Sequence, residues 1–138
     1  MSFARQALPV VGALFVACVV IQVFLAGLGL FDDPRSFETH RQFGYLFGML
    51  TLVLLALALA GRQSRRVVGL SALLLLQFAL QSLLVALRPS PLAALHPVNG
   101  FLILLVAIVV TRAAWQTRAA LAGVQVPAGT TTATGEPA

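Results

Sequence analysis

The segment FETHRQFG, residues 37–44, stands at the start of a long apolar run that continues to Ala60. It contains His40, one of only two histidines in the chain. The second, His96, stands in the segment LHPVNG, residues 95–100, at the start of another apolar run. Such runs decide the fold, and the two histidines are the most chemically distinctive residues that they carry.

The composition places the chain in one class of protein. Its 138 residues are enough for one domain. Hydrophobic residues make up 59% of the chain and charged residues only 9%, whereas soluble domains carry about 25% charged residues. The mean hydropathy is +0.97. We therefore expect an integral membrane protein whose first partner is the lipid bilayer.

Four apolar runs predict four transmembrane helices, because each approaches the ~20 residues that a bilayer requires. The first follows Arg5 as a signal peptide would, but its length and the lack of a clear cleavage site favour a retained helix, with Pro9 in its first turn. We predict an all-α, antiparallel four-helix transmembrane bundle over residues 1–122 and a disordered tail over 123–138. The expected helices span about residues 8–30, 41–60, 67–87 and 92–115, and the first loop spans 31–39.

Arginine supplies the whole basic content of the chain, whose net charge is +5, and it predicts the topology. Cytoplasmic loops of membrane proteins carry the excess of basic residues. Six arginines against three place both termini in the bacterial cytoplasm and both histidines at the outer side of the cytoplasmic membrane. No aromatic-basic patch accompanies them, so nucleic acid is not an expected partner. The six are Arg5, Arg62, Arg65, Arg66, Arg112 and Arg118, and the three are Arg35, Arg41 and Arg88.

The two halves of the chain share a pattern. The interval from Gln22 to His40 is almost equal to the interval from Gln77 to His96. Each histidine is followed, one helical turn later, by a glycine. This weak repeat predicts a pseudo-twofold axis along the membrane normal, with two histidines that behave alike. The two glycines are Gly44 and Gly100.

The pattern predicts a b-type haem with His40 and His96 as axial iron ligands, because histidine commonly ligates haem and helix bundles bind cofactors between facing helices. The glycines would let a flat macrocycle lie against the backbone, and the arginines near it would pair with the propionates. A carboxylate would accept a histidine N–H. The candidate cofactor-binding residues are His40, His96, Gly44, Gly48, Gly100, Arg35, Arg41, Arg88, Glu38, Gln22, Gln77 and Gln81.

Plain structural explanations compete with this interpretation. Gly44 and Gly48 form a small-xxx-small motif for helix packing, the glutamines could bond across helices, and the arginines could be ordinary interfacial residues. The second and fourth helices also differ in length if each ends at an arginine, because more residues separate His40 from Arg62 than separate His96 from Arg112. At the rise of an α-helix, the histidines would differ in level by roughly 9 Å. The proline after His96 is expected to disturb the fourth helix.

The pattern Glu-Thr-His-Arg-x-x-Gly of residues 38–44, with a histidine at the outer start of the fourth helix, resembles one four-helix half of haem A synthase and small bacterial membrane proteins related to it. The resemblance covers about residues 8–115. It implies that His40 and His96 are the axial pair. It also implies that Glu38 lies near the position of the acidic residue that precedes the motif histidine in the synthase. The chain corresponds to only one half, so a homodimer would restore eight helices.

We therefore predict a membrane protein that binds haem b and transfers single electrons, with an unidentified redox partner or quinone. Two other classes stay open at this point. One is a haem-dependent membrane enzyme, such as a quinone or ferric reductase or a haem-modifying protein. The other is a cofactor-free structural subunit of a membrane complex. The colour of the purified protein separates the last class from the first two.

Overall fold

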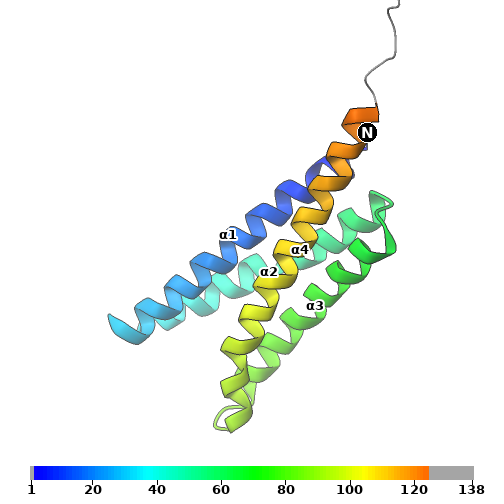
Figure 1. Cartoon of the computed structure of the whole chain (residues 1–138). Helices are drawn as coiled ribbons and strands as arrows, with labels where there is room; N and C mark the ends of the chain where they lie inside the picture. Colours follow the sequence, from blue (N-terminus) through cyan, green and yellow to red (C-terminus); the bar gives the residue numbers. More distant parts are fainter. Residues whose placement is uncertain (1, 125–138) are drawn as a thin grey trace, which may run out of the picture.

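The computed structural model describes residues 2–124, which form four long helices and one short 3-10 helix (Figure 1). The prediction of an all-α four-helix bundle is confirmed. The predicted tail lies outside the described residues, except that 123 and 124 belong to the last helix. The elements are α1 (Phe3–Phe31), α2 (Ser36–Ala60), α3 (Arg65–Ala86), η1 (Pro91–Ala94) and α4 (Leu95–Val124).

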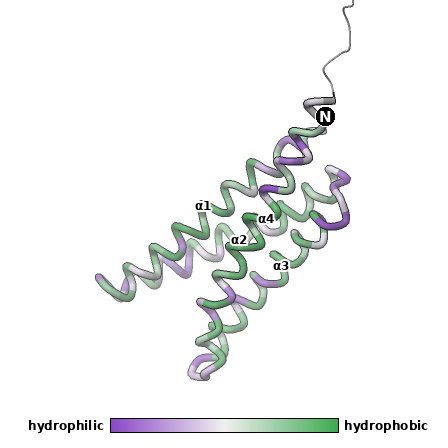
Figure 2. The backbone as a smooth tube through the Cα atoms, viewed as in Figure 1, coloured by the Kyte–Doolittle hydropathy of each residue, from purple (hydrophilic) through white to green (hydrophobic). Residues whose placement is uncertain are grey.

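Each of the four helices is long and apolar enough to cross a membrane. α1 and α3 do not pack on each other; each lies between α2 and α4, so the four helices form a ring of neighbours. Large apolar side chains also cover the outside of the bundle. The backbone tube of Figure 2 is green, the colour of hydrophobic residues, over much of each helix. Examples on the four helices are Phe24, Leu46, Leu76 and Leu105, each more than half exposed. Such a surface is suited to lipid, where an apolar exterior has no cost.

The helices begin and end at different residues from those predicted. α2 begins at Ser36, so the first loop is shorter than residues 31–39 and His40 lies inside the helix. α1 begins at Phe3, so Pro9 lies within the helix and not in its first turn. The expected disturbance of α4 by Pro97 is wrong, because Pro97 stands in the first turn, where a missing N–H costs no helical hydrogen bond.

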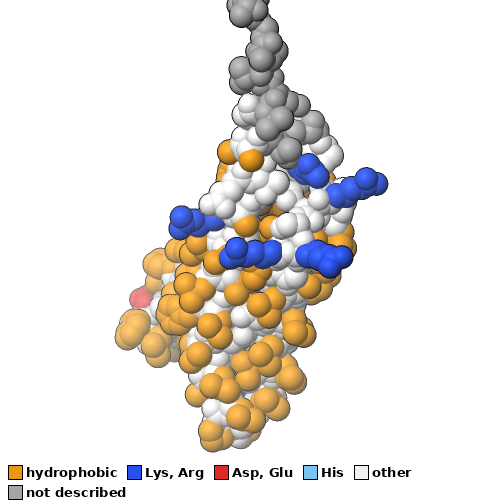
Figure 3. Space-filling model, turned by 45° about the vertical axis from the view of Figure 1, so that its right-hand side comes forward, with side chains coloured by type: hydrophobic (Ala, Val, Ile, Leu, Met, Phe, Trp, Pro, Cys, Tyr) orange, Lys and Arg blue, Asp and Glu red, His pale blue; other side chains and the backbone are white. Residues whose placement is uncertain are grey.

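The bundle is closed at one end and open at the other. Where α1 begins, the Arg5 guanidinium donates from Nε to the carbonyl oxygen of Gly61, at 2.6 Å, in the turn between α2 and α3. Figure 3 shows arginines, in blue, in a band across the visible face near this end. Toward the opposite end, the pair α1–α2 diverges from the pair α3–α4 (Figure 1). Both histidines lie at this second, open end.

Phenylalanines fill the bundle interior next to the open end. Phe47 of α2 lies at the centre of the group, with ring centroids 5.4 Å from Phe15, 5.3 Å from Phe43 and 5.4 Å from Phe78. Aromatic pairs at such separations stabilise a core beyond the area that they bury. The phenylalanine group therefore connects α1, α2 and α3 and separates the open end from the core below it.

Candidate functional site

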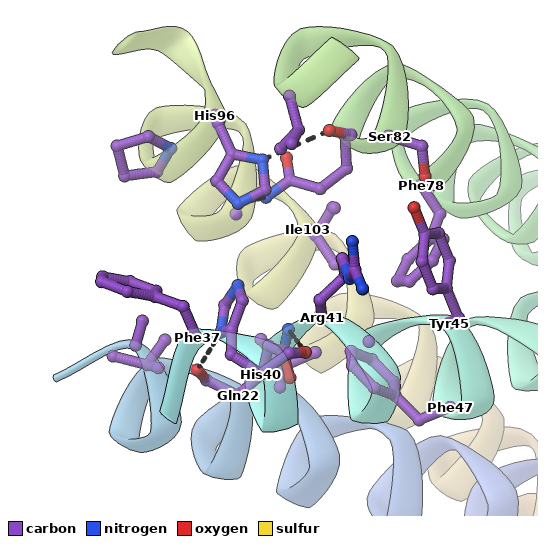
Figure 4. A pocket seen from close by; sticks show the side chains of 18 of the residues that line it. Gln22, Phe37, His40, Arg41, Tyr45, Phe47, Phe78, Ser82, His96 and Ile103 are labelled. Atoms are coloured by element: carbon purple, nitrogen blue, oxygen red, sulfur yellow. Dashed lines mark hydrogen bonds between the residues drawn. The ribbon is translucent and has the colours of Figure 1, made fainter. Parts of the chain in front are cut away.

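His40 and His96 face each other across the open end (Figure 4). His40 projects from the second turn of α2 and His96 from the first turn of α4. Their ring centroids lie 6.2 Å apart, with 63° between the ring planes. The predicted difference in level is therefore wrong. The prediction took Arg112 as the end of the fourth helix, but α4 continues past Arg112 to Val124.

A cavity of about 670 Å³ lies between the two helix pairs and includes both histidines. Pockets that hold cofactors and drug-sized ligands usually measure about 300–1,000 Å³. The cavity is mostly apolar, and all four helices contribute polar groups to it. Its lining includes Gln22 from α1; His40, Arg41 and Tyr45 from α2; Gln81, Ser82 and Arg88 from α3 and the turn after it; and His96 from α4.

The ring of His40 is held by the backbone of α1. Its Nδ1 lies 3.0 Å from the carbonyl oxygen of Gln22, and the Gln22 side-chain amide donates to the His40 carbonyl oxygen at 2.7 Å. A carbonyl oxygen can only accept a hydrogen bond, so Nδ1 carries the proton and donates. The other ring nitrogen, Nε2, is then left with a lone pair that can bind a metal.

The Nδ1 atom of His96 is held in the same way by the backbone of α3. This atom lies 3.2 Å from the carbonyl oxygen of Gln81. Gln81 is therefore the counterpart of Gln22, and the predicted pairing of Gln22 with Gln77 is wrong. Gln77 does not line the cavity. The side-chain amide of Gln81 also approaches the second ring nitrogen of His96, with 3.3 Å between the two Nε2 atoms.

Asn99 belongs to this site, and sequence reasoning missed it. The residue is only 6% exposed. Its Nδ2 donates to the carbonyl oxygen of Gln77 at 2.9 Å and to Oε1 of Gln81 at 2.7 Å. The available signal was an amide inside an apolar run, three residues after His96 and thus on the same helix face.

The glycines face partners inside the bundle. A Cβ at Gly44 would lie 2.8 Å from the Gln22 side-chain nitrogen, and one at Gly100 would lie 3.4 Å from that of Gln81. Gly44 therefore makes room for the glutamine that holds His40, whereas a Cβ at Gly100 would come close to an ordinary van der Waals contact. Gly48 has a different role, because a Cβ there would collide with the Phe78 ring, and it does not line the cavity.

The charged candidates divide into those beside the cavity and those away from it. Arg41 lines the cavity and forms a 2.6 Å ion pair with Glu38. Glu38 bonds Arg41 and Gln42 rather than a histidine, so its predicted role as partner of a histidine N–H is wrong. Arg35 pairs with an aspartate two residues earlier, its side chain is 92% exposed, and it does not line the cavity. Arg88 does line the cavity.

The donor set suits a haem better than a bare metal ion. In the described part of the chain, no three histidine, cysteine or acidic side chains gather to hold an ion. A haem needs only two axial donors, because its macrocycle supplies the other four. Metal–imidazole bonds of about 2.0–2.1 Å, as at zinc, would hold two opposed ring centroids roughly 6 Å apart. The observed 6.2 Å between His40 and His96 is of this size.

Comparison with known proteins yields one similarity. A family of unknown function, DUF6220, matches residues 22–87. The matched stretch begins at Gln22 and includes His40 and Gln81, but it ends before His96. No curated protein and no solved structure matches the chain. The chain is thus similar to this family over the end of α1, all of α2 and α3, and the similarity carries no function with it.

Proposed function

We propose that the protein binds a b-type haem between its two helix pairs, with His40 and His96 as axial ligands, and that it transfers single electrons. One observation supports this proposal most. The two histidines of the chain come from different helix pairs, lie 6.2 Å apart in one cavity, and both have Nδ1 on a backbone carbonyl. That arrangement leaves Nε2 of each ring as the potential metal-binding atom.

Different residues of the chain would have different roles in holding the cofactor. The carbonyls of Gln22 and Gln81 fix the tautomer and orientation of the rings and raise their basicity as ligands. Phe47 and Phe78 supply apolar cavity wall, which lowers the local polarity around the macrocycle. When bound, haem supplies a one-electron iron couple whose potential depends on ligands, burial and nearby charge.

The arginines beside the cavity would neutralise the acidic edge of the cofactor. Arg41 and Arg88 both line the cavity, and a guanidinium is well suited to a carboxylate. Arg41 already pairs with Glu38, so a propionate would have to share or replace that partner. Arg88 makes no ion pair within the described residues, which makes it the better candidate.

The proposed setting is the bacterial cytoplasmic membrane. The arginine asymmetry favours cytoplasmic termini, which would put the histidines near the outer face. A redox partner could then be a protein at that face or a quinone in the bilayer. A homodimer, as the resemblance to haem A synthase implies, would place two such sites in one eight-helix assembly.

Substitution of the histidines tests this function. His40→Ala and His96→Ala should each remove the low-spin signature of the haem-loaded protein, because only one protein ligand would remain, and the double variant should retain almost no haem. Haem content and oxidised and reduced visible spectra measure both effects. Leu46→Ala and Leu105→Ala, on exposed faces of the same two helices, should leave both unchanged. Unaltered spectra in the histidine variants would refute the ligand assignment.

A second candidate function is that of a cofactor-free structural subunit. It is favoured by the way the glutamine side chains fill the spaces opposite Gly44 and Gly100. In that case the histidines and glutamines would serve only to connect helices by hydrogen bonds, which stabilise contacts between membrane helices. A protein that takes up no haem during expression with ample supply would support this candidate.

A further inference from the structure

The two histidines differ at Nε2, although both are held alike at Nδ1. Among the described residues, Nε2 of His40 accepts no hydrogen bond, whereas Nε2 of His96 lies 3.3 Å from the side-chain nitrogen of Gln81. An amide nitrogen can only donate, so the imidazole nitrogen accepts. The lone pair with which His96 would bind iron is therefore already engaged by a neighbouring side chain.

The direction of these hydrogen bonds follows from a backbone group. The carbonyl oxygen of Gln77 can only accept, so the atom of Asn99 that lies 2.9 Å from it is the nitrogen. The same nitrogen lies 2.7 Å from the Gln81 side chain, so the Gln81 atom that it meets is the oxygen. The Gln81 nitrogen is then the atom that faces His96. Every bond from Gln77 to His96 thus has a consistent donor and acceptor.

The first half of the chain lacks this arrangement. The residue three positions after His40, equivalent to Asn99, is Phe43, which cannot orient a glutamine. The Gln22 side-chain nitrogen instead donates to the backbone carbonyl of His40, at 2.7 Å. The side-chain amides of the two glutamines therefore do not follow the pseudo-symmetry of the sequence. For this reason we no longer expect the two histidines to behave alike.

We propose that His40 is the permanent axial ligand and His96 the exchangeable one. Gln81 competes for the Nε2 lone pair of His96, and Asn99 is the positioning residue that orients Gln81. This inference rests on the haem-binding function proposed above. When His96 leaves, it accepts the hydrogen bond of Gln81, and a small uncharged ligand such as a diatomic gas takes the vacated position. No electron is transferred in this exchange.

Carbon monoxide binding to the reduced, haem-loaded protein tests the inference. Wild type should bind the gas with displacement of His96. Gln81→Leu should bind it roughly two- to tenfold more weakly, the range that one neutral hydrogen bond supports, because His96 loses its competitor. Asn99→Leu should shift affinity in the same direction. Gln77→Leu is the matched control, since its side chain lies one turn away and does not line the cavity.

Gln81→Leu in a His96→Ala background distinguishes competition of Gln81 for His96 from a direct contact between Gln81 and the gas. If Gln81 acts by competing for His96, Gln81→Leu should change nothing once His96 is absent; a persisting effect would overturn the inference. In the haem-free protein, Gln81→Leu should move the ¹⁵N resonance of His96 Nε2 and leave that of His40 in place. Equal carbon monoxide affinities in haem-loaded wild type and Gln81→Leu would overturn this inference alone. Failure of the wild-type protein to take up haem would overturn the proposed function as well.

Discussion

At the scale of single residues, each histidine is held by a glutamine that lies opposite a glycine. Gln22 approaches the position of a Gly44 Cβ to 2.8 Å, whereas Gln81 approaches that of a Gly100 Cβ only to 3.4 Å. At the first distance the Gln22 amide would have to move, whereas the second distance is close to an ordinary van der Waals contact. The two halves should therefore respond differently to the same small substitution.

We expect Gly44→Ala to push the Gln22 side-chain amide aside and to cost about 0.5–1.5 kcal/mol, the value of its hydrogen bond to the His40 carbonyl, and Gly100→Ala to cost less. Gly69→Ala is the control, because Gly69 is exposed and a Cβ there meets nothing within 4 Å. It should be neutral or stabilise by about 0.5–1 kcal/mol, since alanine favours a helix. Unfolding in detergent, followed by circular dichroism, measures all three. Equal effects at Gly44 and Gly69 would contradict the close approach of Gln22.

The site could be predicted from the sequence only as far as residue spacing allows. Spacing identifies His40 and His96, because both stand one helical turn before a glycine at the start of an apolar run. Spacing also pairs Gln22 with Gln77, because the two intervals from glutamine to histidine are almost equal, whereas the structure uses Gln81, which is closer to His96 in the chain. Which glutamine meets a histidine depends on the loop and on where each helix begins, and spacing alone does not give these.

At the scale of elements, helix number and order were predictable and helix ends were not. The apolar runs are set by the thickness of the bilayer, which any span must match. Helix ends depend on local hydrogen bonds instead. Ser64, for example, begins α3 by accepting from the backbone N–H of Val67. α4 continues to Val124 because neither Arg112 nor Trp115 interrupts a helix, although the sequence predicts its end near them.

The orientation of α1 gives a test of topology. Ser2 and Asp32 flank the two ends of this helix, and both are exposed. In a Cys18→Ala background, we expect Asp32→Cys to react in intact cells with a maleimide that cannot cross the membrane, and Ser2→Cys to react only after lysis. The reason is the excess of arginine near the start of α1. The reverse labelling pattern would place the histidines at the cytoplasmic face.

At the scale of the whole molecule, a closed end and an open end coexist in one bundle. Arg5 connects the start of α1 to the turn at Gly61 and closes one end. At the other end the helix pairs separate around a cavity of about 670 Å³, with a phenylalanine group below it. The sequence predicts the bundle, because composition and run length suffice. It does not predict the cavity, which depends on how the helix pairs diverge.

Haem binding can be tested with the visible spectrum of the purified wild-type protein. The protein should be expressed with ample haem, and its spectrum recorded in the oxidised and reduced states together with the haem content per chain. We expect one haem per chain and the sharp, low-spin bands of a b-type haem with two axial imidazoles. A correctly folded protein that remains colourless under these conditions would contradict it.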